Sequence, residues 1–237
     1  MILTDKQNEA LKIAVNRYKN KEAYTCIAGY AGSGKTTLVK FIVAALNIPK
    51  ERIAYIAFTG KASHVLRTKG NENAMTAHKF LYYTRRKADG SFVYEPKLNL
   101  KKDYDLIVID EISMLPKEMW ERMLTHKIHV LCMGDPFQLP PVSKESDNQV
   151  LENPHIFLSE IIRQAADSEI IKLSMHLREQ LPLSKFKTEN KEVMIIKSNQ
   201  LNGSMCLWAD QILCGTNKAR NNVNTIIRKL KNFSEKP

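Results

Sequence analysis

Eight consecutive residues near the start of the sequence have the types and spacing of a loop that binds phosphate. Residues 29–36 are Gly-Tyr-Ala-Gly-Ser-Gly-Lys-Thr, which fits the pattern G-x-x-x-x-G-K-[ST] without a mismatch. The glycines let the backbone wrap phosphate groups with its N–H groups pointing inward. We expect Lys35 to reach the outer phosphates of ATP and Thr36 to ligate Mg2+. The residues expected at the nucleotide are Gly29, Gly32, Ser33, Gly34, Lys35, Thr36 and Thr37.

Two adjacent carboxylates follow a short apolar run at residues 106–109. If that run is a parallel strand, its carboxyl end lies at the same sheet edge as the phosphate-binding loop. Asp110 is suited to holding Mg2+ through water, and Glu111 to orienting or deprotonating a water that attacks the terminal phosphate. An acidic strand end without a role is the alternative. Two carboxylates favour hydrolysis over transfer to a small acceptor, since an attacking water needs a base of its own.

A third candidate lies after the apolar run at residues 128–133, where Gly134 and Asp135 begin a loop with several prolines. Gln138 in this loop is expected to project toward the same sheet edge, where its amide can contact a terminal phosphate. Phe137 either stacks on a base, which contributes about 1–3 kcal/mol, or packs under the proline turn. We therefore count Lys35, Glu111 and Gln138 as candidate catalytic residues.

The elements that must position these residues alternate between strands and helices. We expect strands at residues 24–28, 52–58, 105–109 and 128–133, and helices at about 35–46 and 61–69. Thr4 and Gln7 have the spacing of a capping box at the start of a first helix, and Pro116 opens another helix. Such alternation predicts an α/β fold of the RecA-like P-loop NTPase type, with a parallel sheet flanked by helices.

The periodic pattern lapses in two later regions. Residues 82–102 contain Arg85, Arg86 and a turn at Asp89-Gly90, which predicts an inserted β-hairpin. Beyond a helix expected at 168–181, the chain is polar and rich in lysine, with strand-like runs at 193–196 and 212–215 and a helix at 218–231. We therefore expect a motor domain at residues 1–182 and the beginning of a second, incomplete RecA-like domain at 183–237.

Composition limits the classes of protein to which the chain can belong. It has 237 residues, 43% of them hydrophobic, and a formal net charge of +11. The positive charge is compatible with a nucleic-acid partner, although a protein without such a partner can have an equally basic surface. There is no apolar run of membrane-spanning length and no signal segment, so we expect a cytoplasmic protein without a membrane partner. Cys26, Cys132 and Cys214 lie in apolar runs, and are expected to be reduced core residues. Trp120 and Trp208 are expected in core or interdomain packing.

An ordered series of motifs resembles the superfamily 1 DNA helicases, in their RecD-like or Dda-like branch. Besides the phosphate loop, the matching segments are Phe58-Thr59-Gly60-Lys61-Ala62-Ser63, Thr76-Ala77-His78, Asp110-Glu111-Ile112-Ser113-Met114, residues 134–142, residues 158–164, Asp210-Gln211-Ile212-Leu213, and Thr216-Asn217 with Asn224 and Arg228. The resemblance covers nearly the whole chain, and an ordered series of this length is very specific.

The resemblance implies roles for residues that spacing alone leaves open. Gln7 stands where this family has an adenine-reading glutamine, although it can instead close the capping box on Thr4. Arg163 lies in a segment that supplies an arginine to the nucleotide, where such a residue stabilises charge on the transferred phosphoryl group. Four further residues, together with Phe137, are implied in nucleic-acid contact: Thr59, Lys61, His64 and His78.

The function that follows is an ATP-dependent DNA helicase motor domain, an ATP hydrolase that contacts single-stranded DNA with little regard for base sequence. Alternatives are an RNA-directed or ring-forming P-loop ATPase, and a nucleotide-dependent nucleic-acid-binding module with little turnover. A small-molecule kinase is disfavoured because no lid is evident and Glu111 lies beside Asp110. The family's later motifs are not found after Asn217, so unwinding by these 237 residues alone is not expected.

Overall fold

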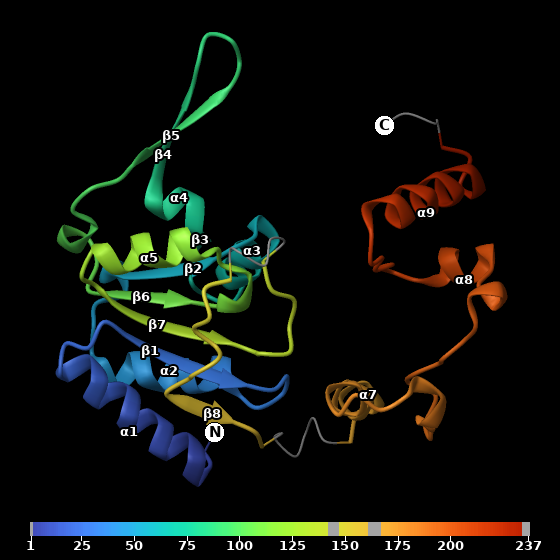
Figure 1. Ribbon diagram of the computed structural model, residues 1–237, viewed down its shortest axis with the longest axis horizontal. Helices are drawn as coiled ribbons and strands as arrows, with labels where there is room; N and C mark the ends of the chain where they lie inside the picture. Colours follow the sequence, from blue (N-terminus) through green and yellow to red (C-terminus); the bar gives the residue numbers. More distant parts are fainter. Residues whose placement is uncertain (1, 142–146, 161–166, 234–237) are drawn as a thin grey trace. The chain divides into compact units, whose positions relative to one another are not determined.

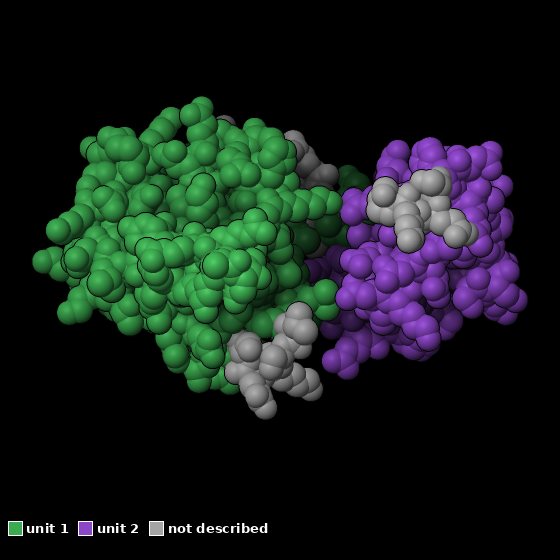
Figure 2. Space-filling model, turned by 90° about the horizontal axis from the view of Figure 1, so that it is seen from above, with its two compact units in different colours: residues 1–171 green, residues 172–237 purple. Residues whose placement is uncertain are grey.

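The computed structural model describes residues 2–141, 147–160 and 167–233 (Figure 1). The chain divides into two compact units, Met1–Ile171 and Lys172–Pro237, which Figure 2 colours separately. The expected domain boundary at residue 182 stays a prediction. No helix among the described residues is both long enough and apolar enough to span a membrane.

The first unit contains a six-stranded sheet in the described part of the chain, with the strand order β3-β2-β6-β7-β1-β8. The strands are β1 (Tyr24–Gly29), β2 (Ile53–Ala57), β3 (Met75–Thr76), β6 (Leu106–Ile109), β7 (His129–Gly134) and β8 (Ile156–Leu158). Every pairing in this sheet is parallel, so all carboxyl ends lie at one edge. The expected fold class is confirmed. The short strands β3 and β8 were not expected, because two or three residues carry no measurable periodicity.

Helices cover both faces of this sheet. The helices that lie wholly in the described part of the first unit are α1 (Asp5–Lys19), α2 (Lys35–Leu46), α3 (Gly60–Thr68), α4 (Ala77–Leu81) and α5 (Lys117–Thr125). Side chains that alternate along each strand separate into two buried clusters, because successive residues point to opposite faces. Ile27 and Leu131 face α1 and α2, whereas Cys26 and Cys132 face α5.

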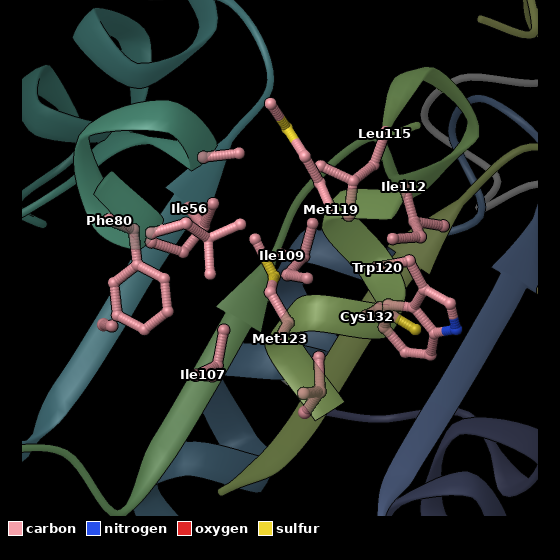
Figure 3. Close-up of a cluster of buried hydrophobic side chains, with 14 of the residues drawn as sticks. Ile56, Phe80, Ile107, Ile109, Ile112, Leu115, Met119, Trp120, Met123 and Cys132 are labelled. Atoms are coloured by element: carbon pink, nitrogen blue, oxygen red, sulfur yellow. The ribbon is translucent and has the colours of Figure 1, made fainter. Parts of the chain in front are cut away.

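Figure 3 shows the cluster on the α5 side, which extends over the sheet from Phe80 to Trp120 and includes Ile107. Phe80 and Ile107 are almost completely buried. Full burial of side chains of this size contributes about 1.5–3 kcal/mol each, which makes this face rigid. The expectation that Trp120, Cys26 and Cys132 belong to the core is confirmed.

Capping residues set the starts of the helices, and those at Thr59 and Thr76 were not expected from the sequence. Thr4 and Gln7 form the complete capping box of α1. The hydroxyl oxygens of Thr59 and Thr76 cap α3 and α4, and Pro116 lies at the N-cap of α5. Short 3-10 segments connect the larger elements: η1 (Lys50–Arg52), η2 (Leu100–Lys102), η3 (Ile112–Met114), η5 (Leu183–Lys185) and η6 (Ser198–Gln200).

The expected hairpin is confirmed as a separate antiparallel pair, β4 (Tyr82–Arg86) and β5 (Phe92–Pro96) (Figure 1). Arg86 pairs with Phe92 next to the turn, where Gly90 has a φ of 84°. Such a left-handed conformation suits glycine.

The second unit is helical in its described part, with α8 (Gly203–Trp208), α9 (Asn217–Leu230) and most of α7 (Glu169–Arg178). The strands expected at 193–196 and 212–215 are wrong, since neither segment pairs with another strand. A strand is stabilised by a neighbour's hydrogen bonds, and apolar residues alone do not supply them. Trp208 is 87% exposed and Cys214 is partly exposed, so neither is a core residue.

Candidate functional site

The phosphate-binding loop connects the end of β1 to the start of α2, as a site for an anion requires. Gly32 and Gly34 have φ angles of 79° and 80°, which let the loop turn into the helix. Gly29 has no room for a side chain, because an added Cβ would lie 2.7 Å from the carbonyl oxygen of Leu158. The loop is therefore a backbone cradle whose shape depends on glycine. Thr37 follows in the first turn of α2.

Lys35 folds back over this cradle. Its Nζ donates to the carbonyl oxygens of Gly29 at 2.6 Å and Tyr30 at 2.9 Å. These carbonyls hold the ammonium group next to the space that the loop encloses. In the same loop, the Oγ of Ser33 is buried without a hydrogen-bond partner among the described residues. A buried hydroxyl without a partner costs about 1–3 kcal/mol, which a bound phosphate oxygen would offset.

Asp110 and Glu111 follow β6 at the same edge of the sheet. Burial raises the pKa of the Asp110 carboxyl, partly opposed by the hydrogen bond from the Glu111 backbone N–H (3.0 Å) and by the charges of Lys35 and Lys69. Burial and the charge of Asp110 also raise the pKa of Glu111. Two carboxylates held close together in a partly buried site favour a bound cation, and they hold protons more tightly than fully hydrated carboxylates do.

Thr36 and Asp110 line the same small cavity, whose volume is about 30 Å3, together with Tyr55 and Asn71. That volume corresponds to about one water molecule. Hydroxyl and carboxylate oxygens are the ligands that Mg2+ prefers, with waters completing its octahedron. Thr36 and Asp110 are therefore donors of the kind that this ion binds, while Val39, Leu66, Val108 and Met133 make the rest of the lining largely apolar. Tyr55 and Asn71 were not expected here, because neither belongs to a motif and only the fold brings them to this edge.

The backbone at Glu111 has an unusual conformation, with φ 57° and ψ 51°. This left-handed geometry is uncommon for a residue with a side chain, and it turns the chain sharply into η3. Asn148 fastens that turn from outside, since its Nδ2 donates to the carbonyl oxygens of Ile112 (2.9 Å) and Leu115 (2.6 Å). Its Oδ1 accepts from the backbone N–H of Val150 at 3.0 Å. Sequence reasoning missed Asn148, which belongs to no motif.

The loop after β7 lies next to the phosphate loop because β7 is the neighbour of β1 in the sheet. Asp135 is buried, its carboxylate accepts from the Phe137 N–H (3.0 Å), and its carbonyl accepts from the Gln138 N–H (3.0 Å). These bonds form a tight turn that leaves Gln138 exposed at this edge. Phe137 packs near Tyr30, with ring centroids 6.0 Å apart. Its expected contact with nucleic acid stays a prediction.

Gln7 is 4% exposed and its side-chain amide already has two protein partners. The Oε1 accepts from the Thr4 N–H at 3.1 Å, and the Nε2 donates to the carbonyl oxygen of Ser33 at 3.2 Å. The capping box is therefore formed, and the same side chain connects α1 to the phosphate loop. Contact between Gln7 and adenine stays a prediction. Arg163 lies outside the described residues.

The residues expected at nucleic acid come from two neighbouring segments. Thr59 is engaged in capping α3, where its hydroxyl oxygen accepts from the Ala62 N–H at 3.1 Å. Lys61 and His64 are exposed on the same helix. His78 is also exposed, and its ring lies 6.3 Å from Phe58 and 6.0 Å from Tyr94 of β5. The structure thus brings His78 together with aromatic rings at the base of the hairpin, which the sequence did not indicate.

Comparisons with known proteins agree with this geometry. The sequence profile described as "AAA domain" matches residues 2–200. The ATP-dependent DNA helicase dda of Enterobacteria phage T4 is 30% identical over 59% of this chain and 33% of its own length. The ATP-dependent RecD2 DNA helicase of Deinococcus radiodurans is 30% identical over 62% of this chain and 20% of its own length.

A solved structure of the Pif1 helicase from Candida albicans shares the fold with a TM-score of 0.52 and 26% identity, covering 78% of this chain and 46% of that one. The chain spans between 16% and 39% of the length of the first two curated relatives it matches. The range matched by the sequence profile includes the phosphate loop.

Proposed function

The chain belongs to the AAA domain family, with helicases of the RecD and Pif1 kinds among its relatives, and from this premise we propose that it is the ATP-hydrolysing motor domain of a superfamily 1 DNA helicase. The observation that carries the proposal is the single cavity that Thr36 of the phosphate loop and Asp110 of the acidic pair share. Motifs 74 residues apart in sequence meet there, at the carboxyl edge of the parallel sheet.

Nucleotide binding rests on an exchange of partners in the phosphate loop. The ammonium of Lys35 leaves the carbonyl oxygens of Gly29 and Tyr30 and binds phosphate oxygens, which are charged and form stronger hydrogen bonds. The backbone N–H groups of the loop and of the first turn of α2 bind the remaining oxygens. Thr36 and Asp110 would hold Mg2+, which when bound neutralises charge on the phosphates.

The chemical step requires a base next to the terminal phosphate. The raised pKa of Glu111 makes its carboxylate a better proton acceptor than a fully hydrated one, provided that it remains ionised at neutral pH. The strained turn at Glu111, fastened by Asn148, fixes where this carboxylate lies. Gln138 and Arg163 complete the proposed catalytic set, at the terminal phosphate and at the developing charge.

The proposed nucleic-acid contacts come from Thr59, Lys61, His64 and His78. Lys61 suits a phosphate contact, and the aromatic group around His78 suits stacking on unpaired bases. Single-stranded DNA is the preferred partner because the named relatives are DNA helicases. RNA remains the rival substrate, and a binding module with little turnover remains the rival activity. The cytoplasmic location expected from the sequence stays a prediction.

The test is an ATPase assay on the purified chain with and without single-stranded DNA, and with RNA of the same sequence. We expect DNA to stimulate hydrolysis more than RNA does, and Lys35→Ala to weaken ATP binding by roughly 100-fold or more through loss of charge-assisted bonds. Lys12→Ala, at an exposed site on α1, is the matched control. Equal ATP affinity for Lys35→Ala and the parent would refute the phosphate-loop assignment. If RNA stimulated hydrolysis and DNA did not, RNA would be the substrate in place of DNA.

A further inference from the structure

A second cavity lies at the opposite edge of the sheet from the phosphate loop. Its volume is about 560 Å3, which is within the range of about 300–1,000 Å3 typical of small-molecule sites. It is lined by three segments that precede the amino ends of β1, β6 and β7. Because these strands are parallel, their amino ends meet at one edge, as their carboxyl ends meet at the other. Both edges of the first unit therefore present a site.

The charges around this cavity are predominantly positive. Lys19 and Lys21 come from the end of α1, Lys101 from η2 and Lys127 from the turn after α5. None of these four lysines has an ion-pair partner in the part of the chain that the structure describes. All four are exposed and line the same cavity.

The two carboxylates that line the cavity, Glu22 and Asp105, are each paired with an arginine that is not part of the lining. Arg17 pairs with Glu22 at 3.5 Å. The guanidinium of Arg52 donates to both carboxylate oxygens of Asp105, with Nη2 to Oδ1 at 2.7 Å, and this hydrogen bonding lowers the pKa of Asp105. The four lysines are therefore in excess. The carbonyl ends of α1 and α5 also face this edge, but two helix ends amount to only about one negative charge together.

The inner wall of the cavity is apolar and aromatic. Tyr18 and Tyr104 line it together with Leu124 and Ile128. His129 holds the Tyr18 side in place, since the two rings contact edge to face with centroids 5.4 Å apart. The Nδ1 of His129 donates to the carbonyl oxygen of Glu22 (2.7 Å), and its Nε2 lies 3.0 Å from the Thr25 hydroxyl. Both ring nitrogens are thus engaged, which makes the wall a preformed surface.

We propose that this cavity binds a nucleoside phosphate, with the base against Tyr18 and Tyr104 and the phosphate between the lysines. Aromatic walls accept a ring of any base, and ammonium groups accept phosphate oxygens. A lysine rim alone would suit any anion, whereas the tyrosines select one that carries a flat ring. The ligand is either a free nucleotide or one nucleotide of a strand, because both present the same groups. The site is separate from the phosphate loop.

The experiment measures binding in the full chain with Lys35→Ala, so that the phosphate loop contributes little. Thymidine diphosphate and the hexanucleotide (dT)6 are each titrated by calorimetry into three proteins. The first is this Lys35→Ala parent. The second carries Lys101→Glu and Lys127→Glu in addition, and the third carries Lys12→Glu and Lys117→Glu in addition. The last pair changes the net charge by the same amount at exposed sites outside this cavity. Thermal unfolding of all three proteins checks that the fold is retained.

We expect the Lys101 and Lys127 pair to weaken binding by about tenfold or more, and the control pair by about twofold or less. The salt dependence of (dT)6 binding should also become less steep, because fewer phosphate contacts release counterions. Binding of both probes identifies free nucleotides as a source, and binding of (dT)6 alone identifies the strand. Equal losses in the two variant pairs, or no binding of either probe, would overturn the proposal.

A direct localisation uses a 5-iodouracil nucleotide, which crosslinks to nearby tyrosine on irradiation. We expect the crosslinked peptide to contain Tyr18 or Tyr104, and the yield to fall in Lys101→Glu with Lys127→Glu. Crosslinks confined to the phosphate loop or to the second unit would contradict the assignment. Because the phosphate loop is tested separately by Lys35→Ala, failure here leaves the proposed ATPase function standing.

Discussion

The two units of the chain differ in how their residues are used. In the first unit, alternate side chains of six strands fill two buried clusters on either side of the sheet. In the second unit, no described residue is buried, and side chains such as Trp208 and Leu213 are almost fully exposed. The same apolar residue types occur in both, but among the described residues only the first unit has a sheet on which helices can pack.

The net positive charge is concentrated in the second unit, whereas the buried residues are concentrated in the first. Residues 172–237 contain 12 Lys and Arg against 5 Asp and Glu, a net charge of +7, while the much longer first unit contains 24 against 20, a net charge of +4. In the first unit, four lysines gather around the cavity near Lys101. The comparison shows that the buried core lies in the first unit, and that most of the excess positive charge lies in the second.

The largest expected effect is on chemistry in the first unit. Glu111→Gln removes the proton acceptor but keeps the shape, so kcat for ATP hydrolysis should fall by about 10^2- to 10^4-fold with little change in ATP affinity. The matched variant in the second unit is Glu179→Gln, at an exposed glutamate, which should leave kcat unchanged. The measurements are steady-state ATPase kinetics and nucleotide titration. Lost binding with kcat retained in Glu111→Gln would exclude Glu111 as the base.

The next effect concerns stability. Phe80→Ala empties a position that is 1% exposed, and should reduce the free energy of unfolding of the first unit by about 3–5 kcal/mol. Leu230→Ala, at a side chain 46% exposed in α9, should cost under about 1 kcal/mol. Urea denaturation followed by circular dichroism compares the two. Equal losses would mean that the second unit has a core of its own, and the contrast between the units would fail.

A smaller effect is expected at the turn after the acidic pair. Asn148→Asp keeps the oxygen that accepts from Val150 but loses both donors to Ile112 and Leu115, so the turn at Glu111 loosens. We expect kcat to fall about tenfold while KM for ATP stays within about twofold. Asn202→Asp in the second unit keeps its acceptor role at the start of α8, and should change neither constant. A fall in kcat that Asn202→Asp reproduces would point to a general effect of charge.

The smallest effect is a change in stability with pH. The raised pKa of Asp110 means that the folded chain binds this proton more tightly than the unfolded chain does, so its contribution to stability falls as pH rises through that range. Asp110→Asn should therefore raise the melting temperature at pH 7 and have little effect in acid, where the native carboxyl is protonated. Differential scanning calorimetry across pH measures this. A variant that melts lower than the parent at pH 7 would show that the carboxylate stabilises the fold.

Local signals in the sequence were sufficient for much of the first unit. The capping box at Thr4 and the phosphate-loop pattern act over a few residues, and each is formed as a local rule requires. The strands β1, β2, β6 and β7 were also predictable, because each is a short, predominantly apolar run. The fold class and the edge at which Asp110 and Glu111 lie followed from their alternation with helices.

Pairing between distant segments decided the rest. The runs at 193–196 and 212–215 have strand-like composition but no partner strand, while Met75–Thr76 forms a strand because β2 lies beside it. Whether a segment becomes a strand depends on its neighbours more than on its own residues. Composition therefore predicted strands in the second unit that are not formed, and it missed the short strands at the edges of the sheet.

The sequence by itself determined the chemistry available to this protein, because a phosphate loop and an acidic pair are defined by residue types a few positions apart. Only the tertiary structure decided how these groups are held. It connects Gln7 to Ser33, fastens the Glu111 turn with Asn148, and brings Lys19, Lys101 and Lys127 around one cavity. Contacts of this kind depend on the order and direction of strands. A parallel sheet gathers residues far apart in sequence at each of its edges, and no local pattern records that meeting.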